Sequence, residues 1–383
     1  MTVAVVAAAR TPIAAADGVF ARWHPVDLTA LVLRELTARG RIDPAVVDEV
    51  WAGCAEPVGA QGADVARAAV LAAGWPERVG GTVVDRAETS GTAALAAAAD
   101  AVLAHGSTAV VLGVSSASTV RPGASALGRT YGRPWGDAPA ARYESSGGLL
   151  PPPRVAARHT AAAGISRAIH DEVTLASHRL RRAASPPAAI LEVAARPADG
   201  STVQRNAPIA TDVLRPAPAD PADLPPAFAD DGLLTGASYA PPADGVTGLV
   251  LAPDGTPGAI ARLRAAVTAA GSPFDATGDA AGALDRALER AGLDRSGVAR
   301  WEVAESSAAG FLALAAVIGA CDAPINPDGG AIATGDAAAA EELRLGIDAL
   351  LRSAPGEIVV ALAGGPTGAA ISVWERLSAD PGS

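Results

Sequence analysis

Lysine is absent from this chain of 383 residues, and all thirty basic residues are arginines. A chain without lysine cannot use a Schiff base or a lysine nucleophile in catalysis. The simplest interpretation of the bias is a GC-rich genome, since Ala, Gly, Pro and Asp are also abundant. The bias therefore excludes one class of mechanism and points to no other.

Aromatic residues and cysteines are also scarce. Aromatics make up 3% of the chain although half of the residues are hydrophobic, so we expect a core built from Ala, Val and Leu. Two cysteines, Cys54 and Cys321, form no CxxC pair, so neither a disulfide framework nor a structural zinc site is indicated. No apolar run reaches the length of about 18 residues that a membrane span needs. We therefore expect a soluble, cytoplasmic protein.

Acidic residues outnumber basic ones, which gives a formal net charge of −11. Nucleic acids and anionic membranes are bound through concentrated positive charge. Neither is expected as a main partner of this chain.

Strand-like and helix-like segments alternate along both ends of the sequence. Short β-branched runs at 3–6, 50–52, 82–84 and 110–113 alternate with helical patterns at 27–39, 64–73 and 90–104. This alternation predicts a mainly parallel sheet covered on both faces. Between 119 and 242 the periodicity weakens, and only 154–182 is strongly helical. We interpret this segment as an insertion.

The second half of the chain repeats the order of the first. Residues 290–303 follow the same pattern of helix, turn, short helix and strand as residues 39–52. The segment 325–330, which leads into a helical segment at 337–351 and a strand at 358–361, matches the 83–113 region. Two similar α/β units predict a duplicated fold. The predicted divisions are 1–118 and 243–256 for the first half, 119–242 for the insertion and 257–383 for the second half.

Several motifs, in order, make the chain resemble the thiolase family. The most specific is the run from Asn326 to Gly335, with sequence NPDGGAIATG, followed by the glycine-rich end at 364–368. Ala8 to Pro12 and the insertion segments 156–159, 164–167, 176–178 and 224–228 fit the same pattern. The resemblance implies a duplicated thiolase fold of class α/β, with two halves forming a layered α-β-α-β-α sandwich and a loop domain inserted in the first half. It also implies acyltransfer on coenzyme A thioesters.

At the positions where thiolases carry their catalytic residues, this chain has other residue types. Thiolases carry a nucleophilic cysteine at a strand-to-helix turn, where this chain has Glu88. The general-base histidine position holds Asp336, and the second cysteine position holds Leu362. The motif that orients a water keeps Glu305 but has Ala304 in place of Asn. Because a carboxylate has no sulfur and leucine cannot move a proton, ordinary thiolase activity is not expected.

Three interpretations of the carboxylates Glu88, Asp336 and Glu305 remain open at this point. They are the remains of a former catalytic pocket with Arg86 as a candidate partner, a new acid/base pair acting on an acyl-CoA or other carbonyl substrate, or a divalent metal or amine site. If the three converge, repulsion should raise at least one pKa. Such a pocket would oppose an enolate, because it adds negative charge where negative charge develops.

The resemblance also suggests ligands and partners. Phe228, Arg205 and Ser238 are candidates for contacts to coenzyme A or an acyl-CoA; no other cofactor and no metal is expected. Our leading hypothesis is a non-catalytic or strongly diverged subunit, as a homodimer or as a heteromer with an active thiolase-type or OB-fold subunit. The alternative is an active acyltransferase or lyase that uses Glu88, Asp336 and Glu305 as acid/base groups.

Overall fold

The computed structural model describes residues 2–127, 136–227 and 232–378. In that part of the chain the strands of the first half are β1 (Val3–Arg10), β2 (Ala14–Ala15), β3 (Glu49–Gly53), β4 (Gly80–Val84), β5 (Ala109–Ser116) and β8 (Ala243–Pro253). The strands of the second half are β9 (Ala261–Ala269), β10 (Arg300–Val303), β11 (Ile358–Gly365) and β12 (Gly368–Arg376). A small separate pair is formed by β6 (Val193–Ala194) and β7 (Pro208–Ile209).

The helices fall into three groups. Those of the first half are α1 (Pro25–Gly40), α2 (Val65–Ala73) and α3 (Ser90–His105). Those of the insertion are α4 (Ala124–Leu127), α5 (Asp137–Tyr143), α6 (Pro152–Ala162) and α7 (Arg167–Ala183). Those of the second half are α8 (Ala280–Ala291), α9 (Ala308–Ile318), α10 (Ala331–Thr334) and α11 (Ala339–Arg352).

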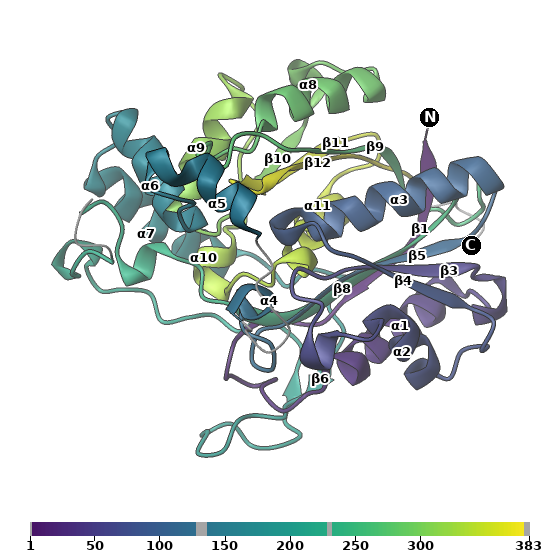
Figure 1. Ribbon diagram of the computed structural model, residues 1–383. Helices are drawn as coiled ribbons and strands as arrows, with labels where there is room; N and C mark the ends of the chain where they lie inside the picture. The colour runs from purple at the N-terminus through teal and green to yellow at the C-terminus, as the bar shows by residue number, and fades with distance from the viewer. Residues whose placement is uncertain (1, 128–135, 228–231, 379–383) are drawn as a thin grey trace.

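These elements stack in five layers. Figure 1 shows α1 and α2 outside the sheet of the first half, α3 and α11 between the two sheets, and α8 and α9 outside the sheet of the second half. The helices α6 and α7 of the insertion lie to one side of the stack (Figure 1). The α-β-α-β-α sandwich expected from the sequence is therefore confirmed.

The two sheets are joined into one. The strand order is β10-β11-β12-β9-β1-β8-β5-β3-β4, and the junction is the antiparallel pair of β1 and β9, where Val3 faces Leu263 and Val5 faces Ala261. On the outer side, β4 ends the path with all five residues partly exposed. The duplicated halves thus meet edge to edge, and within the described residues the outer edge of β4 pairs with no other strand.

Local signals explain the helix boundaries. Asp64 accepts a hydrogen bond from the Arg67 amide and caps α2, and Gly74 and Gly106 end α2 and α3 with φ of 76° and 65°. The predicted helices at 27–39, 64–73 and 90–104 are each confirmed to within two residues.

Two expectations need correction. The segment 154–182 is not one helix, because Gly164 takes a φ of 71° and separates α6 from α7. The predicted counterpart of β4 near 325 is a single bridge between Ile325 and Trp301 in the described residues. In the described residues the second half therefore has one strand fewer than the repeat suggested.

Candidate functional site

The turn from β4 into α3 is held by its own hydrogen bonds. Ala87 has a φ of 48°, an uncommon conformation for a residue with a Cβ. The Asp85 carboxylate accepts from the Ala87 amide at 3.0 Å, and the Ser90 hydroxyl accepts from the Arg86 amide at 2.9 Å while donating to the Ala87 carbonyl at 2.7 Å. The turn therefore fixes where the next residue, Glu88, lies.

Glu88 is directed at the hairpin between β11 and β12. Its Oε2 accepts a hydrogen bond from the Thr367 hydroxyl at 2.9 Å, and a Cβ placed on Gly365 would lie 2.5 Å from the same oxygen. Burial raises the pKa of Glu88, and the Thr367 hydrogen bond partly offsets this. Arg86 forms no ion pair with Glu88 in the described structure, so the suggested partnership is not found there.

Asp336 follows Gly335, whose φ of 113° requires glycine. Its backbone is fixed against the start of β8, because the Ala243 amide donates to the Asp336 carbonyl at 2.9 Å. Its Oδ1 accepts from the Ala338 amide at 2.7 Å. Burial, with the charges of Glu341 and Glu88, raises the pKa of Asp336 to about 7. Glu88 is thus close enough for its charge to affect Asp336.

Glu305 lies in a separate hydrogen-bonded setting. It is 3% exposed and accepts from the Ser177 hydroxyl at 2.6 Å, the Asn326 side-chain amide at 2.9 Å and the Ile332 backbone amide at 3.4 Å. Burial raises its pKa, and these donors lower it. Each oxygen is satisfied, so in this structure Glu305 ties α7 to the loop before α10.

Sequence reasoning missed the buried charges of α11. Glu341, Glu342, Arg344 and Asp348 are all at most 5% exposed, although they lie on the central helix. Arg344 pairs with Glu341 and Asp348, whereas both oxygens of Glu342 accept from backbone amides at the start of α3. The sequence did contain a signal for these residues. Four charged side chains occur in a helix that the layered fold buries between two sheets.

Leu362 is fully buried in β11. It lines a narrow gap that is too small to hold a water molecule, together with Thr92, Glu342, Leu345 and Ser372, among others. Within the described residues no group of three His, Cys, Asp or Glu side chains is placed to hold a metal ion. The metal interpretation of the carboxylates therefore has no geometric support there.

Comparison with known proteins agrees with this architecture. The model of the thiolase N-terminal domain matches residues 3–255, and that of the thiolase C-terminal domain matches residues 258–373. The chain belongs to the thiolase family. The activity, substrates and partners of individual thiolases are not fixed by this assignment.

Individual thiolases match to different extents. The 3-oxoadipyl-CoA/3-oxo-5,6-dehydrosuberyl-CoA thiolase of Escherichia coli is 31% identical over 85% of this chain and 86% of its own length. The steroid 3-ketoacyl-CoA thiolase FadA6 of Mycobacterium tuberculosis is 42% identical, but over 30% of this chain and 31% of that protein. The Acat5 thiolase of Ascaris suum, solved with coenzyme A, is 23% identical with a TM-score of 0.81 over 98% of this chain and all of that one, and so supports the fold.

The residues suggested for coenzyme A do not gather at one place. Ser238 is fully buried, and its hydroxyl is within 3.3 Å of the Thr235 amide and hydroxyl. Arg205 is exposed in the loop between β6 and β7, whose neighbours Val203 and Ala207 pack against the outer core around Trp23. Phe228 lies outside the described residues. An insertion that carries α6 and α7 is present, but these three residues do not define a ligand site.

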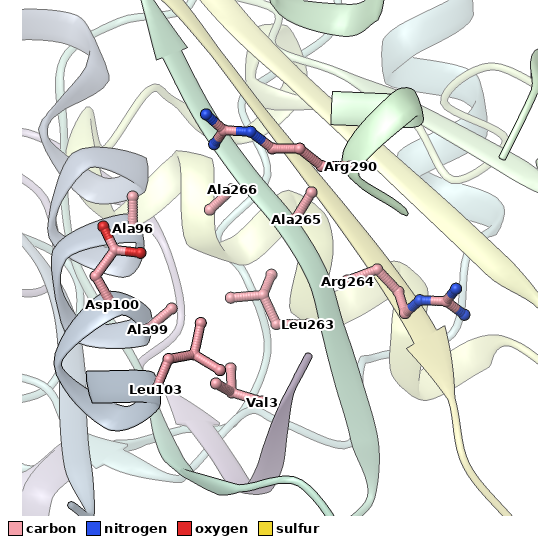
Figure 2. A pocket seen from close by; sticks show the side chains of 10 residues that line it. All are labelled: Val3, Ala96, Ala99, Asp100, Leu103, Leu263, Arg264, Ala265, Ala266 and Arg290. Atoms are coloured by element: carbon pink, nitrogen blue, oxygen red, sulfur yellow. The ribbon is translucent and has the colours of Figure 1, made fainter. Parts of the chain in front are cut away.

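A surface pocket of about 400 Å³ opens near the other end of α3 (Figure 2). Ala96, Ala99, Asp100 and Leu103 of α3 face Val3 and Leu263 across it, while the Arg264 side chain points away. None of the predicted catalytic residues lines this pocket. For a thiolase, we therefore place the candidate site at Glu88 and Asp336.

The raised pKa of Asp336 predicts a pH-dependent stability. An unfolded aspartate ionises near pH 4, whereas the folded one keeps its proton to about pH 7, so the folded state loses stability as pH rises between these values. Asp336→Asn keeps the acceptor for Ala338 but cannot ionise. We expect a shallower loss of stability between pH 4 and 7, measured by urea unfolding at several pH values. Parallel pH profiles for the two proteins would show that Asp336 titrates normally.

Proposed function

We propose that this thiolase-family protein does not carry out cysteine-dependent acyl transfer and acts as a cytoplasmic subunit that partners an active thiolase or another acyl-CoA enzyme. The observation that carries the proposal is Glu88, a half-buried carboxyl at the strand-to-helix turn, whose charge acts on a second carboxyl, Asp336. Such a pair offers no thiolate to acylate and adds negative charge where an enolate would form. Two free cysteines and no disulfide agree with a reducing compartment.

The free edge of β4 supports a partner. Its five residues are partly exposed and it precedes the Glu88 turn directly. An unpaired strand edge offers a row of backbone donors and acceptors to another strand. A second chain is therefore proposed to pair along β4. A homodimer and a heteromer both satisfy this geometry.

The partner is tested by affinity purification from the source organism followed by native mass spectrometry. We expect a stable complex with a second thiolase-type or OB-fold chain, or a homodimer, that is weakened by replacing Val83, whose amide alternates away from β3, with proline. Proline removes one donor from the edge. A strictly monomeric protein with no bound chain would refute the subunit proposal.

Acyl transfer is tested directly with acetyl-CoA and acetoacetyl-CoA. We expect no covalent acetyl adduct on the intact protein and no thiolysis above the rate without protein, because no cysteine stands at position 88. A covalent adduct on Cys54 or Cys321 would overturn the proposal. The buried Cys54 thiol is a poor candidate, since burial raises its pKa to about 11.

One observation favours the alternative of an active enzyme. A carboxyl with a pKa near 7 can donate or accept a proton at neutral pH, and Asp336 fits that requirement. This hypothesis predicts turnover of an acyl-CoA or a β-hydroxyacyl-CoA that falls at least a hundredfold in both Glu88→Ala and Asp336→Ala. Turnover that survives both substitutions would exclude it.

Coenzyme A or an acyl-CoA is the proposed ligand, because the matched relatives named above act on CoA thioesters by their names. Isothermal titration with coenzyme A tests this without requiring turnover. Binding that is unchanged in Arg205→Ala would remove Arg205 from the ligand site. A titration without detectable binding heat would contradict the coenzyme A proposal and leave partner association as the proposed function.

A further inference from the structure

Glu342 caps the helix that follows the Glu88 turn, although the two lie far apart in the sequence. Its Oε1 accepts from the Gly91 amide at 3.2 Å and its Oε2 from the Thr92 amide at 2.9 Å. Both amides belong to the first turn of α3, and the Glu342 side chain reaches them from α11. The residue is 5% exposed, so these hydrogen bonds are largely shielded from solvent.

The helix start has no cap of its own. Thr89, at the N-cap position, makes no capping hydrogen bond with its side chain. The first amides of a helix need external acceptors, and together with the helix dipole they stabilise a nearby negative charge. In this protein a carboxyl from another layer meets that need for two of the amides.

Glu342 differs in this respect from the buried charges around it. Glu341 and Asp348 each pair with Arg344, and Asp348 also pairs with Arg10. Glu342 forms no ion pair in the described structure, and its partners are the amides and the hydroxyl of Thr92. The other charged groups that influence this region are Asp336, which acts on Glu342, and Arg344, which acts on Asp336. The start of α3 is therefore the main polar environment of Glu342.

We propose that Glu342 is a built-in ligand of the α3 start that prevents activation of any nucleophile at position 88. A thiolate there would depend on the first-turn amides for a lowered pKa, and two of these amides already bind Glu342. The loss of thiolase chemistry thus has a second determinant, independent of the residue at position 88. This inference concerns the helix end alone and holds whether or not the chain has a partner or another activity.

The test introduces the missing thiol. In Glu88→Cys the pKa of the new thiol is measured from the pH dependence of alkylation by iodoacetamide, in which the thiolate displaces iodide. We expect a value at or above the ordinary thiol value of about 8.5. In the double variant Glu88→Cys/Glu342→Ala, which frees both amides, the midpoint should fall by about half to one pH unit. Glu342→Gln keeps one acceptor and should give an intermediate value.

Matched controls distinguish an effect of Glu342 on the thiol pKa from the effect of removing any negative charge. Glu88→Cys/Glu289→Ala removes an exposed glutamate on α8 and should leave the midpoint unchanged. Peptide mapping assigns the alkylation to position 88 instead of Cys54 or Cys321. The same midpoint with and without Glu342, or a midpoint well below 8.5 in the single variant, would overturn the inference. The isosteric glutamine variant keeps the test decisive if the alanine variant does not fold.

Discussion

Replacing Arg10 with methionine should lower the free energy of unfolding by about 3–5 kcal/mol, because it breaks a buried ion network. Arg10 is fully buried at the end of β1. Its guanidinium makes two hydrogen bonds to Asp212, at 2.7 and 2.9 Å, and two to Asp348, at 2.8 and 2.9 Å. Despite burial, Arg10 keeps the pKa of Asp212 well below its usual range, with help from Arg181.

The network joins three parts of the molecule. Asp212 also pairs with Arg181 of α7, and Asp348 also pairs with Arg344 on the same helix, α11. Arg10 connects these two pairs, so its loss leaves each carboxylate with one arginine in place of two. The insertion is thereby expected to loosen from the central layer as the chain loses stability.

Denaturant unfolding of Arg10→Met is compared with that of Arg262→Met. Arg262 forms an ion pair of 2.7 Å with Asp254, but the two side chains are 35% and 38% exposed. Exposed pairs contribute little, so this control should change stability by less than about 1 kcal/mol. Equal effects of the two substitutions would contradict the role assigned to the buried network.

Gly113→Ala should destabilise the protein by about 1–3 kcal/mol, because it adds a methyl group where two backbones touch. Gly113 lies in β5 under the start of α11. A Cβ there would lie 2.2 Å from the Ala339 carbonyl oxygen and 2.7 Å from Ala340 Cα. These neighbours are backbone atoms and cannot rotate away. Either α11 moves off the sheet or the strand distorts.

The matched control is Gly236→Ala, where an added Cβ meets no atom within 4 Å. Neither glycine has a positive φ, so backbone preference does not distinguish them. Thermal unfolding should show a clear decrease for Gly113→Ala and little change for Gly236→Ala. Similar melting temperatures would show that α11 approaches β5 less closely than the structure indicates.

Much of the fold was predictable because its signals are local. The strand at 110–113 and the helix at 90–104 follow from apolar periodicity and from glycine at the helix end. The duplication followed from the repeated order of segments. The break at Gly164 was missed because a single glycine inside a strong helical pattern is often tolerated. The single bridge at Ile325 was missed because strand pairing depends on neighbours distant in sequence.

Sequence analysis predicted only those residues of the candidate site that lie in a recognisable family motif. Glu88 and Asp336 were found through their turns, and the structure brings them near each other. Glu342 carries no motif, and its role depends on the packing of α11 against α3, which the sequence does not encode locally. Whether Glu305 takes part with them stays a prediction, since its described hydrogen bonds go to Ser177, Asn326 and Ile332.

The strand order has a consequence for synthesis of the chain. β8 lies between β1 and β5, yet it begins at Ala243, whereas β1, β3, β4 and β5 are complete by Ser116. A ribosome making roughly 5–20 residues per second needs on the order of ten seconds to deliver this central strand after β5 has emerged. During that interval the apolar edges of β1 and β5 are open to wrong pairing. The sheet of the first half therefore cannot be completed until the whole insertion has been translated.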